Sequence, residues 1–114
     1  MSLQNRTPTY QEVVTQFAHT AGTTALTPLL INSKVFIPLN TANANALNAF
    51  LVAGQISDYA QAAVAFAAGD KIYWDDTAKK FTNVSTSNTL CGYALEPSAS
   101  GTGAGIVLFN SNAA

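Results

Sequence analysis

The residues whose types could do chemistry are few and scattered along the chain. His19 is the single histidine, and Asp75 and Asp76 are adjacent carboxylates. A histidine with no cysteine or acid at a fixed spacing supports neither a catalytic triad nor a zinc site. Adjacent carboxylates in a turn typically cap backbone N–H groups, whereas a catalytic pair would have to converge on one pocket. The sequence therefore predicts no catalytic residue, no metal ligand and no enzyme.

The glycine-rich segment 101–105, GTGAG, is the one stretch that could suggest a phosphate-binding loop. Such a loop opens a helix and continues into Gly-Lys-Ser or Gly-Lys-Thr, whereas this segment precedes a predicted strand. We expect a flexible turn here and no bound cofactor.

Aromatic side chains are the remaining candidates for a binding surface. In the segment KIYWD, alternation places Ile72 and Trp74 on one face of a strand and Tyr73 on the other. Exposed aromatic rings can stack on sugars or anchor a protein interface. Tyr73 and Tyr93 are therefore possible contact residues, with core and cross-strand packing as the alternative role, above all for Trp74.

The charge content restricts the classes of partner. The formal net charge is −1, and charged residues make up 10% of the chain, against about 25% in an average domain. Nucleic acids and anionic membranes attract clustered basic residues, which this chain lacks, so we expect neither as a partner. A surface of small neutral groups suits extended contact with other protein, although it is equally compatible with a surface that binds nothing.

The single cysteine, Cys91, excludes a disulfide within the chain, and its apolar surroundings predict a buried, unreactive thiol. The first six residues lack the apolar core of a secretory signal. The longest apolar run, near residues 62–68, is far shorter than the ~18 residues that a membrane helix needs.

The pattern along the chain predicts an all-β fold with a polar, flexible N-terminal arm (residues 1–9) and a single β domain (residues 10–114). Alternating and β-branched runs separated by turn signals give about eight short strands, typical of a compact β-sandwich or jelly-roll-like barrel. The last strand is apolar on both faces, so we expect it to be central and covered. Residues 59–68 are rich in alanine and are interpreted as a loop, with a short helix capped by Asp58 as the alternative. The expected strands cover residues 10–18, 27–31, 34–39, 48–52, 54–57, 71–74, 79–84, 89–95 and 104–109.

Two blocks in the second half carry a resemblance to a known family. Residues 67–75 read AAGDKIYWD, and residues 89–96 read TLCGYALE after a short strand at 79–84. In order and in sequence, these blocks resemble the capsid cement, or head decoration, proteins of tailed bacteriophages. The specific similarity covers about residues 67–110, and the first half matches in pattern.

The resemblance implies a non-enzymatic virion structural protein that binds the outer surface of the phage head. Its implied partner is the major capsid protein, whose neighbouring subunits it would clamp together to stabilise the capsid. It also implies a homo-oligomer, a homodimer first and a trimer second, made in the bacterial host cytoplasm. We expect the N-terminal arm to contact the capsid, through Leu3, Gln4, Asn5, Arg6 and Thr7.

Two other functions remain open at this point. The aromatic residues of the second half would also fit a carbohydrate-binding β-sandwich. A small oligonucleotide-binding barrel would need salt-sensitive binding to single strands, which the net charge of −1 disfavours.

Overall fold

The computed structural model of the protein describes residues 12–111. These residues form eight strands and no α-helix, which confirms the predicted all-β class and shows that the short helix considered for residues 59–68 is wrong. No helix in this part of the chain is therefore long and apolar enough to cross a membrane. The strands are β1 (Val13–Ala18), β2 (Leu29–Ile31), β3 (Lys34–Pro38), β4 (Leu47–Ile56), β5 (Lys71–Asp75), β6 (Lys80–Thr82), β7 (Thr89–Ala94) and β8 (Val107–Asn110).

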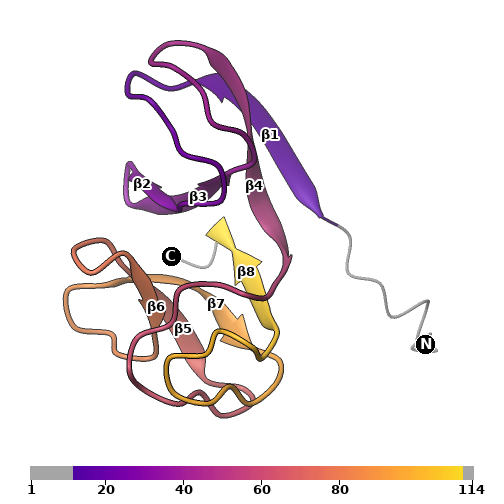
Figure 1. Ribbon diagram of the computed structural model, residues 1–114, viewed down its shortest axis with the longest axis vertical. Coiled ribbons are helices and arrows are strands. Elements are labelled where there is room, and N and C mark those ends of the chain that lie inside the picture. Colours follow the sequence, from indigo (N-terminus) through magenta and orange to yellow (C-terminus); the bar gives the residue numbers. More distant parts are fainter. Residues whose placement is uncertain (1–11, 112–114) are drawn as a thin grey trace, which may run out of the picture.

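The strands form one curled antiparallel sheet in the order β2-β3-β4-β8-β7-β5-β6, with β1 paired to β4. β4 links the two halves of the molecule in Figure 1, because different parts of it pair with different strands. Leu51 pairs with both β1 and β3, and Ala53 with both β1 and β8. β3 and β8 therefore follow one another along one edge of β4, while β1 occupies the other edge. β8 lies between β4 and β7, so the prediction of a central last strand is confirmed.

Two irregularities in the strand pairing change which side chains face inward. Val13 and Val14 pair with Ala53 and Leu51, so Val52 is an extra residue in β4. In the same way, the pairing of β5 with β7 leaves Cys91 as an extra residue. Such bulges bend a strand and re-aim its side chains. β4 is one strand with a bulge where the sequence pattern predicts two strands.

The main core lies inside the curl of the sheet. Alternation along β5 turns Ile72 and Trp74 inward, as the sequence predicts, and both side chains are fully buried. They pack with Val35, Ile37, Leu51, Phe66, Phe81, Cys91, Ala94, Val107 and Phe109.

A second, smaller aromatic cluster joins β1, β3 and β4. The rings of Phe17 and Phe50 stack with their centroids 4.2 Å apart, and Phe36 contacts both rings edge-on. Phe50 is fully buried, and Phe17 is half-buried. This cluster fixes β1 against the first half of β4.

The alanine-rich segment between β4 and β5 follows the sheet instead of forming a helix. Phe81 of β6 exchanges backbone hydrogen bonds with Ala60 and Ala62, and Phe66 exchanges them with Ser98. The amide of Gln61 is buried and bonds Ser98 Oγ, the N–H of Gly103 and the carbonyl of Val64. The backbone hydrogen bonds to Phe81 and Ser98 satisfy part of the segment's backbone from outside it and override its local preference for helix.

Candidate functional site

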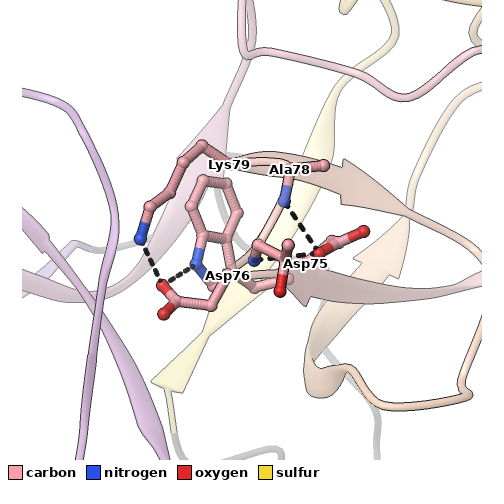
Figure 2. Close-up of polar contacts among 6 residues, drawn as sticks. Asp75, Asp76, Ala78 and Lys79 are labelled. Atoms are coloured by element: carbon pink, nitrogen blue, oxygen red, sulfur yellow. Dashed lines mark hydrogen bonds and ion pairs between the residues drawn. The ribbon is translucent and has the colours of Figure 1, made fainter.

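The two adjacent carboxylates hold the turn between β5 and β6 and point to different partners (Figure 2). Asp75 Oδ1 accepts hydrogen bonds from the N–H groups of Thr77 and Ala78, both at 3.0 Å. Asp76 Oδ1 accepts one from Lys79 Nζ at 2.9 Å and one from the Trp74 indole at 3.0 Å. The hydrogen bond from Lys79 and then that from Trp74 lower the pKa of Asp76. The geometry of the two carboxylates is therefore that of a capped turn, at Asp75, and a local ion pair, at Asp76.

The other residues with reactive side chains are separated from one another. His19 is half-buried at the end of β1, where its carbonyl accepts a hydrogen bond from Asn45 N. Cys91 is fully buried, and burial raises its pKa to about 12, which keeps the thiol protonated. Among residues 12–111, no three His, Cys, Asp or Glu side chains lie close enough to hold a metal ion.

The glycine-rich loop at 101–105 is hydrogen-bonded to the segment that follows β4. Gly103 donates its N–H to Gln61 Oε1 at 2.8 Å and accepts a hydrogen bond from Asp58 N at 2.8 Å. Gly105 donates its N–H to Ser98 Oγ. The predicted turn is present, and no local sequence signal indicates that its backbone is bound to a buried glutamine.

The two candidate tyrosines lie on the outer face of the sheet formed by β5, β7 and β8. Tyr73 pairs with Leu90, while Tyr93 pairs with both Lys71 and Leu108. Directly opposed residues of an antiparallel pair share a face, so the structure brings both tyrosines to one surface. Tyr73 is half-buried, whereas Tyr93 is 44% exposed.

A shallow hollow of about 230 Å³ opens on this outer face. Gly92 is one of its lining residues, and at φ 153° a Cβ atom there would overlap the carbonyl oxygen of Leu108, so this pairing of β7 with β8 requires glycine. The hollow is smaller than the ~300–1,000 Å³ typical of small-molecule sites. Its lining is mostly apolar, which suits the side chain of a protein partner. The lining residues are Lys71, Leu90, Gly92, Tyr93, Leu108 and Asn110.

Two of the lining residues, Leu90 and Leu108, are half-buried on the outer face and lie outside the core cluster. Trp74, one of the aromatics that suggested sugar binding, is only 1% exposed and cannot stack on a ligand from solvent. Strand alternation predicts the correct face for Tyr73. The bulge at Cys91 then changes which residues of β7 lie on the same face as Tyr73.

A second surface feature centres on Leu26, which no sequence signal singled out. Leu26 is 68% exposed and has a positive φ of 64°, which is uncommon for a bulky residue. Two adjoining hollows of about 140 and 110 Å³ both include Leu26, Asp58, Tyr59 and Phe81 in their walls. We call them the Leu26 groove. It forms where the loop before β2 faces the loop after β4, which are distant in sequence.

The expected capsid contacts of the N-terminal arm, Leu3, Gln4, Asn5, Arg6 and Thr7, lie outside the described residues. The candidate surface in the described part of the chain is thus the outer sheet face together with the Leu26 groove. Both are lined by neutral and apolar side chains around few charges, and both fit contact with protein better than they fit chemistry on a small substrate.

Comparison with known proteins supplies the biological setting. The family described as phage cement protein matches residues 8–109, nearly the whole chain. No curated protein and no solved structure matches the chain significantly. The family match covers all eight strands with the exception of the last residue of β8. The chain therefore belongs to the phage cement protein family, which implies a structural role and association with the phage capsid in the virion.

Proposed function

We propose that this protein binds the outer surface of a tailed-phage head, contacts the major capsid protein and clamps neighbouring capsid subunits together as a homodimer. The observation that carries this proposal is the match of the phage cement family to residues 8–109. The capsid role comes with the family, while the outer surface, the partner subunit and the clamping action are our inference. In this proposal the protein is made in the bacterial cytoplasm and acts without catalysis.

Clamping has a simple physical basis. A particle that touches two neighbouring subunits makes its second contact at a high effective concentration, so it binds an assembled lattice better than loose subunits. A homodimer presents every contact surface twice, related by a two-fold axis. It therefore suits a site between two equivalent capsid subunits.

The surface chemistry supports a contact with protein. The outer sheet face presents Tyr93 beside a mostly apolar hollow, and tyrosine is enriched among residues that dominate interface energies. Neutral groups can be buried at an interface without stranding charges, which would be costly. We therefore propose the outer sheet face as a capsid contact, in addition to the arm residues.

The test uses purified heads that lack the protein. The purified chain is added at increasing concentration, and bound protein is quantified against the major capsid protein after sedimentation of the heads. We expect saturable binding and greater resistance of the decorated heads to heat. If the chain neither sediments with heads nor occurs in particles from its own phage, the proposal is wrong.

Two variants locate the contact. Tyr93→Lys should weaken head binding by about tenfold or more if the outer sheet face is used, because it replaces an aromatic anchor with a charge. Val84→Lys is the matched control, since Val84 is 47% exposed on the loop between β6 and β7 and does not line the hollow. Deletion of residues 2–9 tests the arm separately. Unchanged binding by the deletion variant would remove the arm from the proposed interface.

Carbohydrate binding remains a second candidate because Tyr93 is exposed beside the hollow. The burial of Trp74 removes the strongest aromatic from that surface. Screening the chain against bacterial surface glycans, with Tyr93→Ala as the control, would test it. Glycan binding that Tyr93→Ala abolishes would support this function, and no binding would end it.

A further inference from the structure

The edges of the sheet are protected very differently. At one end, β2 has only three residues and follows Pro28, which has no backbone N–H to offer. At the other end, the outer edge of β6 is bonded by the backbone of Ala60 and Ala62. Short strands, proline and a covering loop are the usual means of preventing an edge from pairing with another chain.

Within residues 12–111, β1 has none of these protections. It has six residues, Val13–Ala18, with no proline, no lysine and no other charged residue. Among the described residues its only strand partner is β4, and Figure 1 shows β1 on the outer side of β4. Val13 is 51% exposed and Val14 is 46% exposed. An edge of this length and composition is a template for another strand.

We propose that the strand added to this edge is β1 of a second copy, paired antiparallel across a two-fold axis. This inference rests on the proposed function, of which it specifies the dimer. A two-fold axis normal to the sheet reverses the strand direction, so β1 is its own antiparallel complement. The two sheets then continue into one another through β4, β1 and the two equivalent strands of the second copy.

The two-fold symmetry restricts the register. Directly opposed residues of an antiparallel pair lie on the same face of the sheet, and a two-fold axis normal to the sheet keeps each side chain on its face. Because side chains alternate between the two faces along β1, each residue must lie opposite a residue that is an even number of positions away in the sequence. The two registers with the greatest overlap centre on Thr15 and on Gln16. In them, Glu12 faces Ala18 or Thr20 of the second copy, so no like charges meet. This neutrality favours a second copy over a partner recognised by charge.

The experiment puts charge at the centre of the proposed junction. In the variant V14K/Q16K, lysine lies opposite lysine in both registers. In the register centred on Thr15, position 14 of one copy lies opposite position 16 of the other. In the register centred on Gln16, the two copies of position 16 lie opposite each other. Like charges directly opposed are destabilising in a sheet, and we expect the dimer dissociation constant to rise by about tenfold. V84K/S85K adds the same charge at two exposed positions away from β1 and is the control.

A third variant separates loss of the interface from loss of the fold. V14E/Q16E should dimerise as poorly as V14K/Q16K, whereas an equimolar mixture of the two should form a heterodimer because lysine then faces glutamate. Sedimentation equilibrium over micromolar to millimolar concentrations gives the mass, which should be twice 11.9 kDa for the wild type, for V84K/S85K and for the mixture.

Three results would each overturn the inference: a wild-type protein that stays monomeric throughout this range, a V14K/Q16K variant that remains dimeric, or failure of the mixture to associate. A monomeric protein that still binds heads would refute the β1 junction and the homodimer, and would leave binding to the capsid intact. A β1-dependent dimer that does not bind heads would confirm the junction and refute the proposed function.

Discussion

The clearest test of the fold compares two glycines of one loop. Gly101 and Gly103 both have positive φ, at 71° and 62°, a conformation that disfavours other residues. They differ in their surroundings: a Cβ atom at Gly101 would meet nothing within 4 Å, whereas one at Gly103 would overlap the carbonyl oxygen of Tyr59. Alanine at the two positions therefore separates backbone strain from the close contact between the loops.

The expected magnitudes are well separated. Left-handed conformation costs alanine about 1–2 kcal/mol, part of which is offset by about 0.4–1 kcal/mol from a more restricted unfolded chain. We expect Gly101→Ala to lose about 1 kcal/mol. Gly103→Ala must also displace the loop at Tyr59 and disturb the bonds to Gln61 and Asp58. Each buried group left without a partner costs about 1–3 kcal/mol, so the strain and the two disturbed bonds together cost about 3–7 kcal/mol.

Urea denaturation followed by the emission of Trp74 gives both values, because this single tryptophan is buried in the folded state. Each kcal/mol of lost stability lowers the Tm by about 4 °C, so the two variants should also melt at clearly different temperatures. Equal losses of stability at the two positions would refute the reasoning, since they would mean that the loops do not pack as the structure indicates.

Three further results are expected. Phe50→Ala should lower the free energy of unfolding by about 3–5 kcal/mol and Phe17→Ala by less, as measured by urea denaturation, because Phe50 is fully buried and Phe17 is half-buried; equal losses would contradict this order. The lowered pKa of Asp76 means that its carboxylate stabilises the fold above its usual pKa of 3.8 and that this stability is lost as the pH falls through the lowered value. Thermal melts of the wild type and Asp76→Asn should therefore differ near neutral pH and converge in acid, and a constant difference would contradict the pKa shift. With a pKa of about 12 and no exposure, Cys91 should be alkylated only upon unfolding, so labelling followed by mass spectrometry should be slow in native buffer and fast in urea.

The strand pattern was largely predictable because it depends on neighbours in sequence. Alternation in KIYWD identified the buried face of β5 before any contact was known. The Asp75 turn was predictable for the same reason, since a carboxylate that caps N–H groups two and three residues later needs no distant partner. The order of the blocks between residues 67 and 110 was sufficient to suggest the family that the comparison then established.

The candidate surfaces were less predictable because they depend on pairings between distant segments. The bulges at Val52 and Cys91 decide which residues face outward, and no local signal marks them. Leu26 lies beside Tyr59 only because separate loops meet across the sheet. Sequence patterns identified Tyr73 and Tyr93 as two separate candidates. The register of β7 with β5 and with β8 places both on one face of the sheet.

The sequence by itself determined the all-β class, the low charge, the inward position of Trp74 and the capsid family. Only the tertiary structure decided that the alanine-rich segment follows β6 rather than forming a helix, and that among the described residues β1 has β4 as its one strand partner. The physical reason is the same in both cases. A backbone hydrogen bond must be satisfied somewhere, and for a strand or an extended loop the partner comes from a part of the chain that local sequence does not specify.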